Sequence, residues 1–289
     1  MIRATLALLA VFALVSSAFA DNHENSWRGV DLDKNFGMQF EVCSLQAGKS
    51  VADVAKLDAR LKQAWSKMNI NLSVIRLTPL YSHGMPGQSN VDYIDLVMGD
   101  INEFGAAWDA WMVSDEAAKL MADTAKVGDC SFKFGQGINK MLNAAELEST
   151  DNRLMTMNWC APREGVSSEH LKAKHASWLV DNGDDLDIAA WNIFMPRLGA
   201  GSRHGKFMHL ASYTSASKLM ANQDWLANGG GAAAMRDYEN SYATCEGESA
   251  WVAAVFVNKD VAFIDYATLA SEGLSAHNSF GGFSQTSLV

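Results

Sequence analysis

Apolar side chains in the first half of the chain switch between the two-residue spacing of a strand and the spacing of a helix face. Residues 36–43 alternate as a strand does, and Ser50, with Asp53 three residues later, is a typical helix N-terminus. In chain order, the pattern predicts a strand at 36–43, a helix after Ser50, strands at 72–80 and 91–98, a helix at 103–126 and a short strand at 130–134. The predicted order is β-α-β-β-α-β.

The second half repeats this order. Its pattern predicts a strand at 154–160, a helix from Ser168, strands at 188–195 and 207–212, a helical region interrupted at 229–231, and a closing strand at 250–257. Pro79 and Pro196 lie 117 residues apart, and each is expected to end the second strand of its half.

A short cysteine motif relates the two halves. Cys43 begins a Cys-x4-Gly-x-Ser segment, and Cys160 begins a second such segment 117 residues later. A further cysteine follows in each half, Cys130 in the first and Cys245 in the second. A unit of this length is a duplicated domain, because solenoid repeats are far shorter. We expect an N-terminal arm without regular structure at 21–34, repeats at 35–144 and 145–270, and a flexible tail at 271–289.

The predicted element order is that of the ferredoxin-like fold, an α+β arrangement in which helices cover one face of a sheet. In that fold the first and last strands are neighbours. Four cysteines allow three pairings. The fold implies the pairing that uses the same geometry in both repeats, namely Cys43 with Cys130 and Cys160 with Cys245.

Two ferredoxin-like units each leave one sheet face without helices, and that face must be buried. Here the chain resembles the dimeric α/β-barrel superfamily of antibiotic-biosynthesis-monooxygenase-like proteins, in element order and duplication over about residues 35–260. The resemblance implies two repeats packed sheet to sheet as a pseudo-dimeric α/β barrel. The superfamily includes cofactor-free oxygenases, haem-degrading and haem-dependent enzymes, isomerases and stress proteins, so it leaves the chemistry open.

The first 20 residues are typical of a signal peptide. Arg3 precedes an apolar run, and Ala18 to Ala20 form a small-x-small cleavage signal. Export to the periplasm or the extracellular space favours disulfides between the four cysteines. A formal net charge of −10 argues against non-specific binding to nucleic acid. No second long apolar run predicts a membrane span in the mature chain, and the oligomeric state stays open.

Ionisable residues within predicted strands are candidates for a ligand site. Asp95 and His209 occupy matching positions on the third strand of each half, where each either lines a cavity or is hydrogen-bonded inside the core. Arg76 lies in the middle of a predicted strand. It either binds a substrate carboxylate or pairs with Asp95 across neighbouring strands.

Three other histidines have weaker patterns. His83 and His204 each precede a glycine in the loop after the second strand. They either flank equivalent pocket mouths, as ligands or acid–base groups, or belong to exposed turns. His175 lies near the apolar stripe of its predicted helix and is expected to be a packing residue.

Three functions are consistent with these features. The first is an exported, disulfide-stabilised protein that binds a small apolar or aromatic ligand, because tryptophans are frequent in the helices and isolated polar residues lie on strand faces. The second is an oxygenase or a haem-linked enzyme of the resembled superfamily, using His209, His83 or His204. The third is a structural or interaction module of the envelope. No catalytic residue is assigned and no metal-binding spacing is present, because nucleophile-elbow, HExxH and CxxCH patterns are absent.

Overall fold

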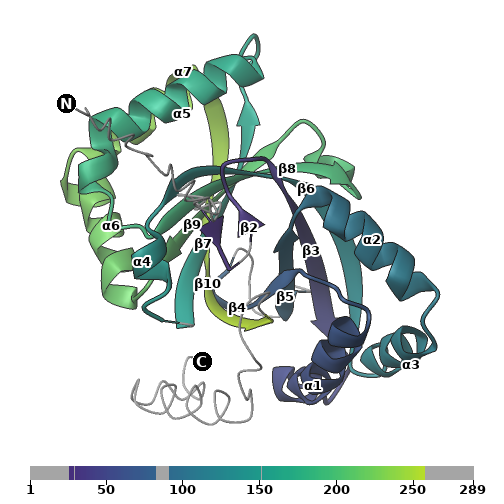
Figure 1. Ribbon diagram of the computed structural model, residues 1–289. Coiled ribbons are helices and arrows are strands. Elements are labelled where there is room, and N and C mark those ends of the chain that lie inside the picture. Colours follow the sequence, from purple (N-terminus) through teal and green to yellow (C-terminus); the bar gives the residue numbers. More distant parts are fainter. Residues whose placement is uncertain (1–25, 29, 83–90, 151, 258–289) are drawn as a thin grey trace, which may run out of the picture.

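The computed structural model describes residues 26–28, 30–82, 91–150 and 152–257 (Figure 1). Its first half contains β1 (Ser26–Trp27), β2 (Val30–Asp31), β3 (Phe36–Leu45), α1 (Val51–Lys67), β4 (Ser73–Tyr81), β5 (Tyr93–Gly99), α2 (Ile101–Met112), α3 (Asp115–Thr124) and β6 (Gly128–Leu142). Its second half contains α4 (Ala144–Leu147), β7 (Asn152–Pro162), α5 (Ser168–Asn182), η1 (Gly183–Asp185), β8 (Ala190–Leu198), η2 (Gly201–Arg203), β9 (Phe207–Tyr213), α6 (Ala216–Asn228), α7 (Gly231–Ser241) and β10 (Ala243–Val257).

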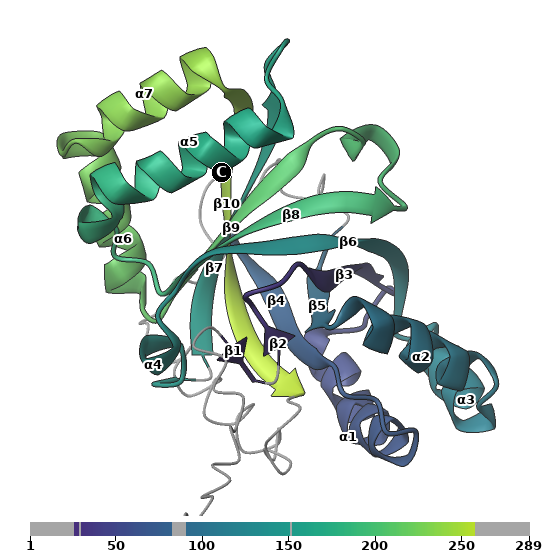
Figure 2. The same cartoon turned by 45° about the horizontal axis from the view of Figure 1, so that its top comes forward.

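Eight strands close into an antiparallel barrel in the order β10-β4-β5-β3-β6-β8-β9-β7. The neighbours β6-β3-β5-β4 come from the first half and β10-β7-β9-β8 from the second, so both halves have the strand order of a ferredoxin-like unit. The helices lie outside the barrel in two groups on opposite sides, α1 to α3 on one and α5 to α7 on the other (Figures 1 and 2). The predicted α/β barrel is therefore present, with its two sheets joined edge to edge.

Two long strands join the halves. The sequence predicts only a short strand after Cys130, but β6 runs on to Leu142. Its first part pairs with β3, and from Phe134 onward it also pairs with β8. At Gly135, a Cβ atom would collide with the carbonyl oxygen of Met195, so glycine permits the close approach of β6 and β8. Likewise β10 pairs with β7 and, from Ala250, with β4.

The barrel interior is a packed apolar core. Alternate residues of β3 point inward, with Phe36, Met38 and Phe40 all buried in one cluster. The same cluster includes Trp27 and Val30 from the hairpin of β1 and β2. These residues belong to the N-terminal arm expected at 21–34, and in the described part of the arm the side chain of Trp27 is buried, at 5% exposed.

The structure corrects two further predicted boundaries. The helix predicted at 103–126 is two helices, because the Ser114 hydroxyl accepts a hydrogen bond from the amide of Ala117 and starts α3. Pro79 does not end its strand, which runs to Tyr81. Pro79 pairs with Trp251 of β10 on one side. On its other side the pairing of β4 with β5 has already ended at Leu77, so the missing N–H of the proline interrupts no hydrogen-bond ladder there.

Both predicted disulfides are present. Cys43 bonds to Cys130 across β3 and β6, and Cys160 bonds to Cys245 across β7 and β10. Two disulfides are typical of a protein outside the cytoplasm. Within the described ranges, the helices are all too short or too polar to cross a membrane.

Candidate functional site

Two cavities lie between the barrel and its helices, one in each half. The first has a volume of about 270 Å³ and lies under α1, α2 and α3. The second has a volume of about 280 Å³ and lies under α5, α6 and α7. Both have a floor formed by the outward side chains of the sheet, on the opposite face from the barrel core. We call them the first pocket and the second pocket.

Matching positions of the two halves form the floors of the two pockets. Asp95 lies directly opposite Glu41 on one side and Arg76 on the other, in a row across β3, β5 and β4. His209 lies in the same way between Asn158 and Ile193, across β7, β9 and β8. The predicted match of Asp95 with His209 therefore holds in the register of both sheets.

A buried ion network forms part of the first pocket. Arg76 is 3% exposed and binds two carboxylates, each through two hydrogen bonds. Its Nη1 and Nη2 donate to Asp58 at 2.8 and 3.0 Å, and its Nε and Nη2 donate to Asp95 at 2.8 and 2.9 Å. Burial raises the pKa of Asp58 to about 6, against the opposing effect of the guanidinium. Of the two roles predicted for Arg76, substrate binding and pairing with Asp95, the structure shows the pairing with Asp95.

Glu41 is the other carboxyl on this floor. It is partly buried, and it accepts a hydrogen bond of 2.8 Å from the amide of Gln39. The Gln39 oxygen in turn accepts a hydrogen bond of 3.1 Å from the indole of Trp108 on α2. Burial, with a further contribution from Asp95 on the next strand, raises the pKa of Glu41 to about 8. Near neutral pH this carboxyl is therefore mostly protonated.

Aromatic side chains form the walls of the second pocket. Trp178 on α5 packs edge to face on Trp191 of β8, with ring centroids 5.8 Å apart, and on Trp225 of α6, at 5.9 Å. The apolar character of this wall suits a flat apolar or aromatic molecule.

A chain of hydrogen bonds lies at the floor of the second pocket. The indole N–H of Trp191 donates to Nδ1 of His209 at 3.1 Å, which places the His209 proton on Nε2. That Nε2 lies 3.3 Å from the hydroxyl of Tyr238, which lies 2.8 Å from Nε2 of His175. Every group is satisfied when Trp191 donates a hydrogen bond to His209, His209 donates to Tyr238, and Tyr238 donates to His175. Burial lowers the pKa of His209 to about 3 and that of His175 to about 4, so both imidazoles are neutral.

Two buried polar atoms of residues that line the second pocket have no hydrogen-bond partner within the described part of the chain. They are the Nε1 donor of Trp178 and the Oδ1 acceptor of Asn222, whose side chain is only 6% exposed. The amide nitrogen of Asn222 is used, because it donates to the hydroxyl of Tyr213 at 3.1 Å. A buried polar group without a partner costs about 1–3 kcal/mol. A bound molecule with an acceptor and a donor would satisfy both.

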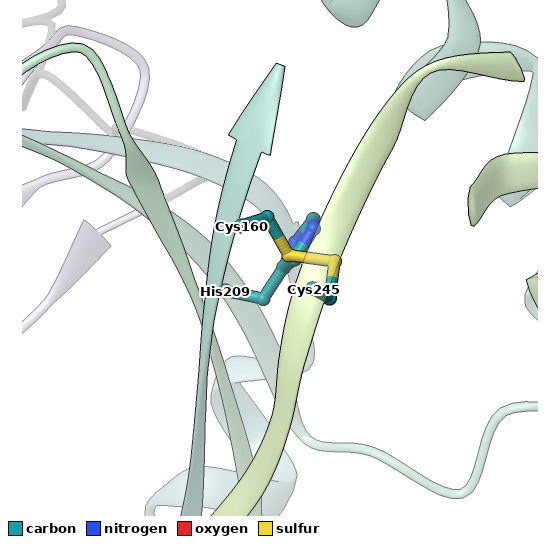
Figure 3. A group of neighbouring side chains, drawn as sticks. All are labelled: Cys160, His209 and Cys245. Atoms are coloured by element: carbon teal, nitrogen blue, oxygen red, sulfur yellow. A yellow bond between two sulfur atoms is a disulfide. The ribbon is translucent and has the colours of Figure 1, made fainter. Parts of the chain in front are cut away.

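The cysteines next to His209 are not a metal site in this state. Nitrogen and sulfur atoms of His209, Cys160 and Cys245 lie within 4.8 Å of one another. Figure 3 shows the reason for their closeness: the two sulfurs are bonded to each other, and the His209 ring packs beside the bridge. A disulfide has no thiolate to offer a metal ion.

The structure places the predicted site residues unevenly. Arg76 and Asp95 line the first pocket and His209 lines the second. His204 is exposed in the loop before β9 and lines neither pocket, and His83 lies outside the described residues. His175, expected to be a packing residue, is buried but also lines the second pocket.

The sequence pattern missed three contributors, Glu41, Asp58 and Tyr238. A signal for two of them was present. The 117-residue offset between Cys43 and Cys160 also relates Glu41 to Asn158 and Asp58 to His175. Comparing polar residues at positions 117 residues apart could therefore have identified Glu41 and Asp58 as candidates. Tyr238 has no such partner in the pattern.

Comparison with known proteins shows the fold and no family. The sequence matches no protein-family model and no curated protein sequence. An anthrone oxidase-like protein has a similar structure, with a TM-score of 0.50, 8% identity, and coverage of 79% of this chain and 95% of that chain. A monooxygenase-like protein from Fusobacterium nucleatum subsp. nucleatum has a TM-score of 0.47 at 8% identity, covering 80% and 97%. The encapsulated DyP-type peroxidase from Mycobacterium smegmatis has a TM-score of 0.44 at 9% identity, covering 76% and 92%.

At such low identity these similarities show the fold alone. The chain has a mixed α/β fold with an eight-stranded antiparallel barrel of the dimeric α/β-barrel type. The resemblance in element order is thereby supported.

Haem, which the resembled superfamily makes a candidate cofactor, does not fit the described residues of either pocket. Both ring nitrogens of His209 are hydrogen-bonded, and Nε2 of His175 is bonded to Tyr238, whereas a haem-ligating histidine needs a free nitrogen. No lysine or arginine is among the described residues that line the second pocket, so the propionates have no cation there. In the first pocket, Arg76 is already bound by two aspartates.

The neutral state of His209 predicts a pH effect on stability. Its pKa is about 3 in the folded chain and about 6.5 when unfolded, so between these values only the unfolded state binds the proton. The stabilisation is complete above pH 6.5 and is lost as the pH falls. We expect His209→Gln to reduce the drop in unfolding free energy between pH 7 and pH 4 by about 1–3 kcal/mol. Urea unfolding across this range measures it, with the exposed His204→Gln as matched control. An equal drop in wild type and His209→Gln would contradict the prediction.

Proposed function

We propose that the second pocket binds a small, uncharged aromatic molecule. The observation that carries this proposal is the neutral hydrogen-bonding chain of His209, Tyr238 and His175 at the floor of a cavity walled by tryptophans. Since burial keeps both imidazoles neutral and no lysine or arginine is among the described lining residues, an anionic ligand would find no countercharge in this pocket. A planar ligand stacks on the indoles and satisfies the open donor of Trp178 and the open acceptor of Asn222.

We further propose that the bound molecule is a substrate for oxygenase chemistry, as in the anthrone oxidase-like protein that shares the fold. A substrate with an acidic CH₂ group gives a proton to the hydroxyl oxygen of Tyr238, whose own proton passes to Nε2 of His175 along their 2.8 Å hydrogen bond, because the anion that forms nearby raises the pKa of the imidazole. Molecular oxygen is the oxidant. One of its atoms becomes a carbonyl oxygen and the other leaves as water with the two hydrogens, so that R₂CH₂ and O₂ give R₂C=O and H₂O. The rival function is binding without turnover.

The compartment and origin of the chain belong to the same proposal. Two disulfides and the apolar segment before Ala20 support a protein that is secreted or periplasmic after cleavage of its first 20 residues. The matched cysteines and the equal strand order of the two halves support an origin by duplication of one ferredoxin-like unit.

Titration with anthrone and 1-naphthol, followed by quenching of tryptophan fluorescence, tests the binding. We expect uncharged ligands to bind and 1-naphthoate, which is charged, to bind at least tenfold more weakly. Trp178→Phe, which removes the open N–H donor, is expected to weaken binding about fivefold, in line with about 1 kcal/mol per hydrogen bond.

Trp108→Phe is the matched control, because it alters only the first pocket. Equal affinities in the two variants, or no binding of any uncharged ligand, would refute the binding site. Oxygen consumption with anthrone separates the two functions. Consumption that His175→Gln abolishes supports an oxygenase, and tight binding without consumption supports a binding protein.

A further inference from the structure

The first pocket differs from the second in the ionisable groups on its sheet floor, although the second pocket is also lined by two carboxyl groups, Glu239 and Glu248. Among the described residues that line it, four carry a carboxyl group and one carries a guanidinium: Glu41, Asp58, Asp95, Asp129 and Arg76. The guanidinium is bound by Asp58 and Asp95 through four hydrogen bonds. In the described part of the chain, no cationic side chain forms an ion pair with Glu41, whose hydrogen-bond partner is the neutral amide of Gln39.

Aromatic rings line the same pocket as this carboxyl. Phe132 on β6 lies directly opposite Glu41 in the sheet, and its ring packs edge to face on Trp108 with centroids 5.7 Å apart. Trp65 on α1 and Trp111 on α2 also line the cavity. Aromatic faces attract ammonium groups by about 0.5–2 kcal/mol each, more so when water is excluded. A carboxyl group among aromatic rings therefore has the chemistry of a receptor for an organic cation.

We infer that the first pocket is a second binding site and takes a small organic cation, an amine or quaternary ammonium whose charged group lies at Glu41. This site is separate from the proposed aromatic site and does not depend on it. At the matching position of the second half stands Asn158, which has no charge to offer. The two halves thus keep a cavity at the same place but differ in whether this floor position carries an ionisable group.

Binding of a cation at Glu41 is coupled to a proton. With its pKa near 8 in the free protein, Glu41 is mostly protonated at pH 6.5 and must release the proton to pair with a cation. The groups that face it are Asp95 on β5, Arg76 on β4, Asp58 on α1 and Tyr93 on β5, with Asp129 exposed at the mouth. Of these, Asp95 contributes most to raising the Glu41 pKa, and Arg76 opposes it.

The test uses choline and its uncharged isostere 3,3-dimethyl-1-butanol, titrated into the full chain by isothermal calorimetry. At pH 9.5 we expect choline to bind at least tenfold more tightly than the alcohol. From pH 9.5 to pH 6.5 the affinity for choline should fall roughly thirtyfold, because binding below the pKa must first remove a proton. Titrations at pH 6.5 in two buffers of different ionisation enthalpy should show the release of about one proton for each choline bound.

Glu41→Gln keeps the size of the side chain and removes the charge, so it should abolish the preference for choline over the alcohol. Glu164→Gln, at an exposed position of the second half, is the matched control and should change nothing. Proton release in the wild type decides the matter even if Glu41→Gln does not fold. Equal binding of choline and the alcohol, or choline binding without proton release at pH 6.5, would overturn the inference. Neither outcome bears on the aromatic site of the second pocket.

Discussion

Replacing Arg76 by methionine is expected to lower the free energy of unfolding by about 3–5 kcal/mol at pH 8. The guanidinium is the only described partner of Asp58 and Asp95 that bonds to both, through four hydrogen bonds of 2.8–3.0 Å. Methionine fills a similar volume, but it leaves two buried carboxylates without their shared countercharge. The cost is therefore electrostatic, and a loss of packing contributes little.

The pH dependence distinguishes this cause from simple misfolding. Without Arg76 both aspartates are expected to take up protons, so the destabilisation should be smaller at pH 5 than at pH 8. Asp58→Asn and Asp95→Asn, added to Arg76→Met, should restore part of the lost stability because no charge is then buried. Arg197→Met, an exposed position, should cost less than about 0.5 kcal/mol. A loss below 1 kcal/mol for Arg76→Met, measured by urea unfolding, would show that the network is not structural.

Replacing Cys43 and Cys130 together by alanine is expected to lower the free energy of unfolding by about 4–5 kcal/mol. The bond closes a loop between residues 87 apart in sequence, and removing it gives the unfolded chain more freedom. Cys160 and Cys245 are 85 residues apart, so the double alanine variant of that pair should lose nearly the same stability.

The two disulfide variants should differ in ligand binding. Only the bridge between Cys160 and Cys245 packs beside the His209 ring (Figure 3), so its removal should weaken the binding of 1-naphthol to the second pocket. The variant of Cys43 and Cys130 serves as the control of equal stability loss. Denaturant unfolding and fluorescence titration measure the two effects. An unchanged unfolding free energy in either variant would contradict the loop-closure estimate.

The two halves have the same strand order, but their pockets have different residues on the sheet floor. In one half the sheet floor holds Glu41, Arg76 and Asp95, and in the other it holds Asn158, Ile193 and His209. Cavity volume differs little between the halves, about 270 and 280 Å³. The floor residues are what distinguish the two pockets, so the ligands that they accept should differ in the chemical group that meets the floor more than in size.

Local patterns predicted the elements that depend on neighbouring residues. The start of α1 follows from Ser50 and Asp53, whose side chains and backbone amides form the predicted reciprocal cap. Alternation along β5 placed Asp95 on one face of the strand with Tyr93 and Val97, and in the structure this face is the helix-covered one. Such features are readable because strand and helix periods repeat over a few residues.

The contacts that make the two sites were not readable in this way. Asp58 on α1 meets Arg76 of β4, and Tyr238 on α7 bridges His175 and His209, each pair joined only when a helix docks on the sheet. The distance between a helix side chain and a sheet side chain depends on how the helix is rotated about its axis and placed on the sheet. The local spacing of apolar residues does not specify that placement.

The sequence by itself determined the order of strands and helices, the two disulfide pairs through the fold that this order implies, and the faces on which Asp95 and His209 lie. Only the tertiary structure decided that β6 and β10 extend to close one barrel, that Trp27 enters its core, and that two cavities form with different ionisable groups on their floors. The physical reason is range. Periodicity and capping act within a few residues, whereas barrel closure, ion pairing and cavity formation depend on groups far apart in the chain.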